Sequence, residues 1–438
     1  MAMPWRRRSR KPKAKPAADL PPSTVPEIAI SPHFRCPISL ELMKDPVTAS
    51  TGITYDRQSI ETWLELGHAT CPVTKQELRS DVLLPNVALT RMIQSWCEAH
   101  SALGVERIPT PKVPLSVAQA EEILSGLADA GCRRDAGRCG ELARRVRALA
   151  RESERSRRCL ETSGAGRALA ATFSAFSAEY FEFPELLEGV LAAMAAVGAA
   201  AVDAEAASFL AAPESLNVLV EMLRHGSLAA RFNAAVAVKS LLAASSRATS
   251  ELVSATEGMV EALAKLVREP ISQQAMKAAL AAIYYMVSED ERAAEMAVEQ
   301  GIVPALVELL AEPERAMCEK ALAVLDGLLC CERGREAACG HALAVPALVK
   351  RMFRVSEAAT ELAVSALWKL CGDCRRCSRE ALQVGAFQKL LLLLQIGCGE
   401  KTKERATELL KSLSGHCSGK QHIDCVDTVD FKGVIKHV

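Results

Sequence analysis

The cysteine and histidine side chains of residues 31–105 are the first candidates for metal chemistry in this chain. The stretch contains three of each, namely Cys36, Cys71, Cys97, His33, His68 and His100. A small module built around two zinc ions needs eight such ligands, usually arranged as Cys-x-x-Cys pairs. No such pair occurs between residues 31 and 105. Two zinc sites cannot be assembled, so we expect this stretch to fold without metal.

Two of these cysteines are also candidate nucleophiles. A nucleophilic cysteine needs a neighbouring base or a positive field that lowers its pKa. No Cys/His pair stands out around Cys36 or Cys71. We therefore interpret both as small core residues and predict no covalent catalytic residue.

A further set of thiols lies at the end of a predicted helix. Cys371, Cys374 and Cys377 are spaced three residues apart, before and around Arg375 and Arg376. This spacing superficially resembles a run of zinc or iron–sulfur ligands, but it lacks a fourth ligand. We expect surface thiols rather than a metal site.

The elements that must position Cys36 and Cys71 are two loops and a hairpin. Residues 33–43 and 70–75 are the loops, and each contains a Cys-Pro pair. Strands at residues 47–49 and 53–55 flank Ser50-Thr51-Gly52. A glycine at this place favours a tight hairpin turn.

Helices follow the hairpin and the second loop. Asp56 is placed to cap the first helix, and Gly67 is placed to end it. The second helix begins after Asn86. The apolar sides of the two helices consist of Ile60, Trp63, Leu64, Leu89, Ile93 and Trp96.

Charged side chains can tie the loops together where metal is missing. Hydrogen bonds among them would replace metal–ligand bonds, although the sequence leaves their pairing open. The candidates are Glu41, Lys44, Asp45, Asp56 and Arg57.

Five short motifs in this stretch carry a resemblance to a known family. They are Phe34-x-Cys36-Pro37-Ile38-Ser39, Asp45-Pro46-Val47, Gly52-Ile53-Thr54-Tyr55-Asp56-Arg57, Cys71-Pro72-Val73-Thr74 and Pro85-Asn86-x-Ala88-Leu89. The order of loop, hairpin, helix and loop is that of a RING finger, and the same order without zinc resembles the U-box family. The resemblance implies a small, zinc-free, RING-like α+β domain over residues 31–105.

Two apolar markers recur with one period along the rest of the chain. The first is Leu219, Leu263, Leu306, Leu348 and Leu390, separated by 44, 43, 42 and 42 residues. The second is Met286, Leu328, Leu370 and Leu413, separated by 42, 42 and 43 residues. Units of this length that begin Gly-x-x-Pro-x-Leu-Val resemble armadillo repeats, each of which buries its apolar face only against its neighbours. We expect a mainly α protein whose residues 115–417 form an armadillo α-solenoid of about five to seven units.

Proline and charge mark the predicted domain boundaries. Residues 1–30 form a basic arm that we expect to be disordered, and it would serve as a nuclear signal, a contact with acidic membranes or a flexible tail. Residues 106–114 carry three closely spaced prolines and predict an extended linker. Residues 418–438 are predicted to be a polar tail.

Composition agrees with this fold and excludes other classes of protein. Half of the 438 residues (50%) are hydrophobic but only 4% are aromatic, which favours Ala/Leu helices over an all-β fold. The 53 basic residues balance 53 acidic ones, so no global field for nucleic acid or membranes exists. No segment reaches the ~18 apolar residues of a transmembrane span. The 16 cysteines of a long chain without a signal peptide predict reduced thiols, in the cytoplasm or also the nucleus.

Five arginines are predicted to share one face of a helix over residues 141–164. Their spacing of 3, 4, 4 and 3 residues places them in line, and they are Arg144, Arg147, Arg151, Arg155 and Arg158. We interpret this face as solvated, with enough charge to attract an acidic peptide or anionic lipid. Nucleic-acid binding is disfavoured because the rest of the chain is net acidic.

The two resemblances together identify the chain as a member of the plant U-box ubiquitin ligases with C-terminal armadillo repeats. They imply a transferase of the aminoacyltransferase class that binds a ubiquitin-conjugating enzyme charged with ubiquitin and recruits a protein substrate to the armadillo groove. Transfer in this family needs neither a ligase thioester nor a cofactor. The resemblance also implies a role in plant defence or stress signalling, whereas homodimerisation is left open.

The resemblance assigns roles to five residues. Ile38, Leu40, Trp63 and Pro72 would form the apolar patch that docks the conjugating enzyme. Lys75 stands where many relatives carry an arginine that contacts both enzyme and ubiquitin, and lysine lacks the planar fork of arginine. The rival interpretation is a non-catalytic adaptor whose U-box is folded but inactive. The intact docking residues argue against this rival, whereas Lys75 argues for it.

The absence of zinc ligands leads to a first prediction. Strong chelators should leave the melting temperature of the purified 31–105 fragment unchanged, because hydrogen bonds rather than metal hold it together. Circular dichroism melts with and without chelator measure this. Stoichiometric zinc in the purified fragment would contradict it.

Overall fold

The fold was obtained as a computed structural model, which describes residues 30–66, 68–78, 83–101, 105, 115–311 and 314–417. The predicted linker at 106–114 and tail at 418–438 lie outside these residues, as does the basic arm up to residue 29 and the predicted helix end at Gly67. The chain divides into two compact units between residues 113 and 114. Each unit has a hydrophobic core of its own.

The first unit is a small α+β domain. Its elements are η1 (Pro32–Phe34), β1 (Pro46–Thr48), β2 (Thr54–Asp56), α1 (Arg57–Glu65), β3 (Leu84–Pro85) and α2 (Val87–Ala99). The three strands form an antiparallel sheet in the order β2-β1-β3. Its core includes Val47, Tyr55, Ile60 and Ile93. The third strand is not predicted by the sequence, because Leu84–Pro85 is too short to show a strand pattern.

The hairpin between β1 and β2 has a tight turn with a glycine in it, as predicted. Gly52 has φ of +78°, in the left-handed region that glycine adopts without steric cost. Val47 pairs with Tyr55 across the two strands, which places both side chains in the core. Asn86 then starts α2, where its side chain accepts a hydrogen bond from the Leu89 N–H.

The second unit consists of helices throughout. They are α3 (Val117–Cys132), α4 (Ala136–Glu152), α5 (Glu154–Thr162), α6 (Ala165–Ser177), α7 (Pro184–Val197), η3 (Ala199–Ala201), α8 (Ala204–Leu210), α9 (Pro213–His225), α10 (Leu228–Ala244), α11 (Arg247–Ala255), α12 (Met259–Arg268), α13 (Gln273–Glu289), α14 (Glu291–Glu299), α15 (Ile302–Leu309), α16 (Arg315–Leu328), α17 (Glu332–Gly340), α18 (Ala344–Arg351), α19 (Glu357–Asp373), α20 (Arg375–Gln383), α21 (Ala386–Ile396) and α22 (Glu400–Cys417). From α8 onwards they group as triplets of first, second and third helices, such as α14, α15 and α16. This arrangement confirms the predicted mainly α solenoid.

Both periodic markers are buried where the period predicts. The first lies on the second helices (α9, α12, α15, α18 and α21), and the second lies on the third helices (α13, α16, α19 and α22). Every residue of the two markers is at most 1% exposed. Third helices of successive repeats pack against one another, α10 on α13, α13 on α16, α16 on α19 and α19 on α22. One continuous core therefore runs from α3 to α22.

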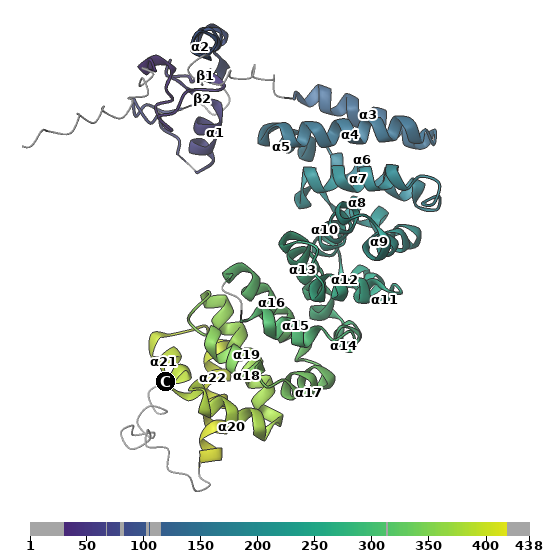
Figure 1. The fold of residues 1–438 in the computed structure, drawn as a ribbon, viewed down its shortest axis with the longest axis vertical. Coiled ribbons are helices and arrows are strands. Elements are labelled where there is room, and N and C mark those ends of the chain that lie inside the picture. Colours follow the sequence, from purple (N-terminus) through teal and green to yellow (C-terminus); the bar gives the residue numbers. More distant parts are fainter. Residues whose placement is uncertain are drawn as a thin grey trace, which may run out of the picture. The chain divides into compact units, whose positions relative to one another are not determined.

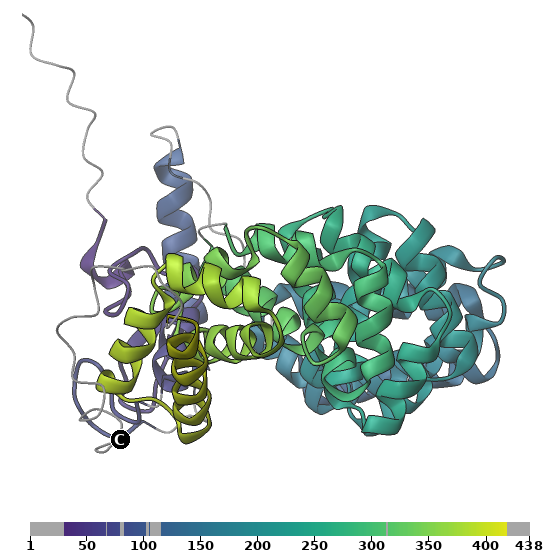
Figure 2. The same ribbon diagram turned by 90° about the horizontal axis from the view of Figure 1, so that it is seen from below.

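The ribbon views of the second unit show this order directly. Its helices follow one another in chain order along a curved stack (Figure 1), and the view turned by 90° again shows successive repeats side by side (Figure 2). No single helix among the described residues is long and apolar enough to cross a membrane. One bent pair, α8 with α9, passes that test together but turns by 72° at its break.

The predicted glycine and proline signals mark the start of second helices. Gly258, Gly301 and Gly385 precede α12, α15 and α21 with φ between 69° and 81°, a conformation that ends one helix and redirects the chain into the next. Pro304 lies in the first turn of α15, where its missing N–H breaks no helical hydrogen bond.

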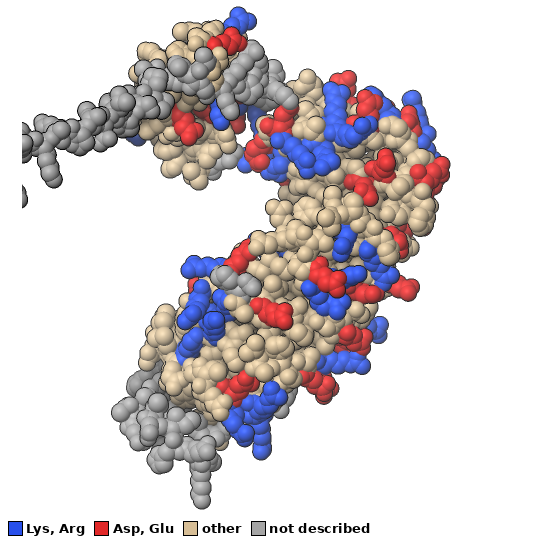
Figure 3. All heavy atoms as spheres, viewed as in Figure 1, with Lys and Arg blue, Asp and Glu red and all other residues tan. Residues whose placement is uncertain are grey.

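The predicted helix over residues 141–164 is two helices. Ser153 has extended backbone (φ −155°, ψ 151°) and its side chain caps α5 by accepting from the Ser156 N–H. The prediction that five arginines share one helix face is therefore wrong, because Arg155 and Arg158 lie on a different helix from the other three. Acids also neutralise part of the charge, since Arg158 pairs with Glu154. Figure 3 shows acidic side chains among the basic ones on these first helices.

Close packing between α6 and η3 gives a second prediction. A Cβ at Gly166 of α6 would lie 1.8 Å from the Ala201 carbonyl oxygen, whereas nothing lies within 4 Å of a Cβ at Gly189 of α7. Gly166→Ala should lower the unfolding free energy by about 1–3 kcal/mol through overpacking. Gly189→Ala, the matched control, should be neutral or stabilising by up to about 1 kcal/mol. Urea unfolding of the full chain measures both, and equal effects would contradict the packing.

Candidate functional site

The two loops of the first unit have the same backbone hydrogen bonds. In loop one, Cys36 donates its N–H to the Glu41 carbonyl at 2.8 Å and accepts from the Leu40 N–H at 2.8 Å. In loop two, Cys71 donates to the Gln76 carbonyl at 2.7 Å and accepts from Lys75 at 2.9 Å. An antiparallel bridge closes each loop, between Arg35 and Leu42 and between Thr70 and Glu77. The shared Cys-Pro-(Ile/Val)-(Ser/Thr) sequence therefore folds twice into one loop structure.

The residue four positions after the cysteine of each loop has left-handed backbone. Leu40 and Lys75 both have φ of +61°, a region that non-glycine residues rarely adopt. The hydrogen bond from each residue's N–H back to its cysteine carbonyl holds this conformation. Both side chains are exposed, and that of Leu40 keeps 68% of its surface in solvent.

The Cys71 sulfur is the centre of a buried hydrogen-bond cluster. It contacts the Tyr55 hydroxyl at 2.9 Å and accepts from the Thr74 N–H at 3.3 Å and the Thr51 hydroxyl at 3.5 Å. Burial alone would raise the pKa of this thiol, but hydrogen bonds from Thr74, Tyr55 and Thr51 outweigh it and lower the pKa to about 6. Burial, followed by the contact with Cys71, raises the pKa of Tyr55. These bonds tie loop two to β2 and to the hairpin turn.

The Cys36 sulfur plays the corresponding part for loop one. It accepts from the Asp56 N–H at 3.3 Å, which links the loop to the start of α1. Burial acts to raise the pKa of Cys36, but backbone hydrogen bonds, first that of Ser39, lower it overall. Cys36 and Cys71 are both 0% exposed. Neither sulfur is therefore accessible to a thioester on another protein, and the interpretation of both as core residues is confirmed.

Asp45, Asp56 and Arg57 form the charged ties between loop one and α1. Asp56 Oδ1 accepts from the N–H groups of Lys44 at 2.8 Å and Asp45 at 2.9 Å. Arg57, 8% exposed, donates its Nε to Asp45 Oδ2 at 2.6 Å. Asp56 is the N-cap residue of α1 as predicted, but its carboxylate accepts no N–H of the helix and binds the preceding loop instead. Glu41 and Lys44 take part through their backbone, and their side chains are exposed.

Trp63 joins α1 to loop two. Its indole N–H donates to the Thr70 carbonyl at 2.8 Å, and its ring stacks on His68 with centroids 4.1 Å apart. Pro72, partly buried, follows two residues after Thr70. The structure thus brings together Trp63 and the loop that carries Pro72 and Lys75.

Ile38 and Leu40 lie on loop one, which meets the other end of α1 through Cys36 and Asp56. Ile38 and Trp63 are partly buried and pack against the core of the domain. Leu40 makes no such contribution, so core packing does not explain its apolar side chain. One apolar residue was missed by the sequence analysis: Val73, at the loop-two position equivalent to Ile38, is 52% exposed. The repeated Cys-Pro-(Ile/Val) pattern could have indicated it.

The cysteines near residue 371 are not surface thiols. Cys371 is 2% and Cys377 is 1% exposed, so that prediction is wrong for these two, whereas Cys374 is partly buried. Cys371 lies on α19, whereas Cys374 is the N-cap of α20 and Cys377 lies in its first turn; these two helices pack against each other, which takes the thiols away from solvent.

Comparison with known families covers both units. The U-box domain family matches residues 30–102, and the family described as the plant U-box protein ARM repeat region matches residues 119–436. U-box domain-containing protein 21 of Arabidopsis thaliana is 40% identical over 438 residues, covering 99% of each chain. U-box domain-containing protein 20 of the same plant is 39% identical, covering 94% of this chain and 93% of its own. E3 ubiquitin-protein ligase PUB23, also from Arabidopsis thaliana, is 36% identical, covering 88% and 93%.

The hydrogen bonds to Cys71 give a pH-dependence prediction. A depressed pKa in the folded state contributes stability that is fully present above the unfolded-state pKa of about 8.5. This stability is lost as the pH falls through the folded-state pKa of about 6. The unfolding free energy of the 31–105 fragment should therefore rise between pH 6 and about 8.5.

Cys71→Ser should flatten this rise, because a serine hydroxyl keeps the hydrogen-bond acceptor but does not ionise in this range. Urea unfolding at several pH values measures the slope. Wild-type and Cys71→Ser fragments with the same slope would show that Cys71 remains a neutral thiol.

Proposed function

Because the chain belongs to the family of plant U-box proteins with an armadillo-repeat region, we propose that it is a RING-type ubiquitin-protein ligase. Two relatives carry this activity in their names, E3 ubiquitin-protein ligases PUB23 and PUB22. The observation that carries the proposal is the pair of matching loops around α1, which hold apolar side chains outward from a rigid base.

Docking of the ubiquitin-conjugating enzyme is assigned to these loops. Leu40, 68% exposed, supplies apolar surface that the domain's own core does not use. Ile38 and Trp63 pack on the core and, like Pro72, lie half-buried, so each can still present an edge to a partner. Val73, exposed on loop two, extends the same apolar character. A docking patch of this kind needs no ligand-induced rearrangement, because hydrogen bonds to two buried sulfurs fix both loops.

Lys75 is assigned the contact that orients ubiquitin. Its exposed side chain projects from the same loop as Pro72, and its ammonium can donate to carbonyls of the conjugating enzyme and of ubiquitin. Restricting the thioester-linked ubiquitin to an attack-ready arrangement lowers the activation barrier of transfer by several kcal/mol. Lys75 is in this sense a positioning residue, with no part in bond making.

Transfer then proceeds directly to the substrate. The substrate lysine amine attacks the thioester carbonyl, a C–N bond forms and the C–S bond breaks. The conjugating enzyme's thiolate leaves, and the proton lost by the amine passes through solvent to that thiolate. No thiol of the U-box domain intervenes in this step. Cys36 and Cys71 are fully buried and engaged in loop hydrogen bonds.

Substrate recruitment is assigned to the third helices of the solenoid. A depression of about 390 Å³ lies between α16, α19 and α22. Acidic and basic side chains line it together, including Asp326, Glu361 and Arg405. Arg405 also lies 5.4 Å over the ring of Trp368, beside the depression, and donates to Ser365 Oγ at 2.7 Å. A surface with both charges and an aromatic ring suits a peptide segment of a protein substrate.

Docking is tested with purified components by the rate of ubiquitin discharge from the charged conjugating enzyme. Leu40→Ala should slow discharge at least severalfold without changing the melting temperature, because Leu40 is exposed and alanine keeps the same backbone strain. Ile38→Ala should slow it too, with some loss of stability. Leu84→Ala, on β3 and 63% exposed, is the matched control and should leave discharge unchanged.

Normal discharge by Leu40→Ala and Ile38→Ala would withdraw the docking assignment. No discharge by the wild-type chain with any of several conjugating enzymes would instead favour the rival function, a non-catalytic armadillo adaptor. The observation behind this rival is a lysine at position 75.

The Lys75 assignment has its own test. Lys75→Arg should raise the discharge rate severalfold, because a guanidinium can bridge two acceptors and charged hydrogen bonds are worth about 1.5–3 kcal/mol. Lys75→Ala should lower the rate. Affinity for the uncharged conjugating enzyme should stay constant in both, which separates positioning from docking. Equal discharge rates for lysine, arginine and alanine would place residue 75 outside the activating contact.

A further inference from the structure

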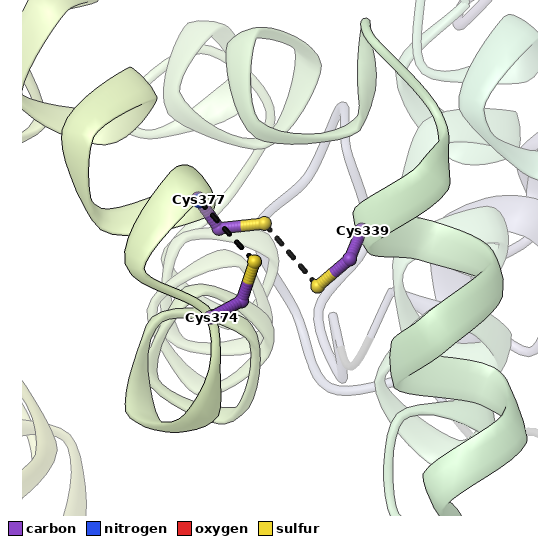
Figure 4. A group of neighbouring side chains, drawn as sticks. All are labelled: Cys339, Cys374 and Cys377. Carbon is purple, nitrogen blue, oxygen red and sulfur yellow. Dashed lines mark hydrogen bonds between the residues drawn. The ribbon is translucent and has the colours of Figure 1, made fainter.

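Three sulfur atoms converge inside the solenoid, far in the chain from the candidate docking site. Cys339, Cys374 and Cys377 have Sγ atoms that all lie within 4.8 Å of one another. Cys377 Sγ donates to Cys339 Sγ at 3.3 Å, and the Cys377 N–H donates to Cys374 Sγ at 3.5 Å. Figure 4 shows the three side chains pointing toward one another. We define these residues as the three-cysteine cluster.

The cluster joins two repeats. Cys339 lies near the end of α17, the first helix of one repeat, and Cys377 lies in the first turn of α20, the first helix of the next. Cys374 is the N-cap of α20. The start of α20 therefore holds two of the three thiols. The third, Cys339, comes from α17 and precedes Cys374 by 35 residues.

The preceding repeat interface lacks such a cluster. Aligning the starts of α14, α17 and α20 places Val298 and Gly334 at the positions of Cys339 and Cys377. These two residues offer no metal ligand in their side chains. Only the N-cap cysteine is shared, as Cys331 of α17. The α17/α20 interface thus departs from the chain's own pattern by placing thiols where the solenoid needs only apolar packing.

We propose that the three-cysteine cluster binds a thiophilic metal ion of the Zn²⁺ type through three sulfurs, with a water molecule as the fourth ligand. Thiolate sulfur selects zinc and similar soft ions over calcium and magnesium. Ligands drawn from two separate helices can enclose the ion on three sides. The partly buried position of Cys339 and Cys374 leaves one side open to solvent.

Three thiolates whose sulfurs lie within 4.8 Å of one another would repel, so a cation between them is needed to balance their negative charges. Without metal, the hydrogen bond from Cys377 Sγ to Cys339 Sγ is one that a protonated, neutral thiol makes. Binding replaces the S–H protons of the cluster by one divalent ion and releases those protons to solvent. The resulting single negative charge lies at the N-terminus of α20 and next to Arg375 and Arg376 in sequence.

Cys371 does not supply a fourth ligand to the three-cysteine cluster. It begins the Cys-x-x-Cys-x-x-Cys run but is 2% exposed and is not among the sulfurs within 4.8 Å. The sequence pattern therefore pointed to the wrong set of three, because it could not include Cys339. A bound ion would clamp α17 to α20 and stiffen the last repeats of the solenoid.

The test uses the full chain, reduced and freed of metal, titrated with Zn²⁺ against a chromophoric chelator and separately with Cd²⁺. The wild type should bind one more equivalent than Cys374→Ser and show a stronger thiolate-to-cadmium charge-transfer band. Zn²⁺ should raise the melting temperature of the wild type by linkage, and this shift should be lost in Cys374→Ser and in Cys339→Ser.

Cys331→Ser is the matched control, since it replaces the N-cap cysteine of the preceding repeat and leaves the cluster intact. Serine is itself a good N-cap residue, so Cys331→Ser and Cys374→Ser should both preserve the start of their helix. Melts without metal show whether each variant is folded. Retention of the same zinc equivalent and thermal shift in Cys374→Ser, or equal loss in Cys331→Ser, would overturn the proposal, as would a wild type that binds no zinc.

Discussion

Hydrogen bonds to two buried sulfur atoms are the interactions on which the U-box domain depends. In a zinc-binding module each metal would fix the ends of two loops at once. Here Cys36 and Cys71 each lie in one of the two loops, and their sulfurs accept hydrogen bonds from the hairpin, from the residue that precedes α1 and from loop two itself. A buried donor without an acceptor costs about 1–3 kcal/mol. The two sulfurs therefore specify the loop positions as well as filling the core. These hydrogen bonds fix the two loops and thereby position the exposed apolar residues of the candidate docking site.

The solenoid follows a different rule. Each repeat buries its apolar face only against the repeats beside it, so the same leucine positions recur and the core extends without a centre. Its third helices pack in sequence and carry the residues that line the depression between α16, α19 and α22. Rigidity in one unit and extended surface in the other suit the proposed function, in which a conjugating enzyme and a substrate bind to different units. Each unit is stabilised by its own hydrophobic core, so the sequence of one unit is not constrained by the packing of the other.

Local patterns in the sequence predict much of the fold. The 42- to 44-residue period places the marker leucines correctly, because a helix face is a local property of the chain. The motifs of the U-box likewise predict its order of elements. The break at Ser153 is not predictable in this way, because serine can either continue a helix or cap a new one, and tertiary packing decides. The third strand is too short to leave a pattern.

The candidate sites divide along the same line. Ile38, Leu40, Trp63, Pro72 and Lys75 could be nominated because they belong to contiguous motifs, and their docking and activating roles stay predictions. The network around Cys71 was missed, since Thr51 and Tyr55 come from the hairpin and only the fold brings them to loop two. Cys339 was missed for the same reason. A contact across 35 residues leaves no mark on spacing within a short segment.

The left-handed conformation of Leu40 and Lys75 has a consequence for how this domain can evolve. An L-residue in this region is less stable by roughly 1–2 kcal/mol than glycine would be. Glycine at either position would thus be the thermodynamically easier choice, yet it would remove a side chain to which the proposed function assigns a partner contact. Selection for fold stability and selection for partner binding therefore oppose each other at these two positions. Stabilising libraries of this domain should enrich glycine there, and the enriched clones should be the ones that lose activity.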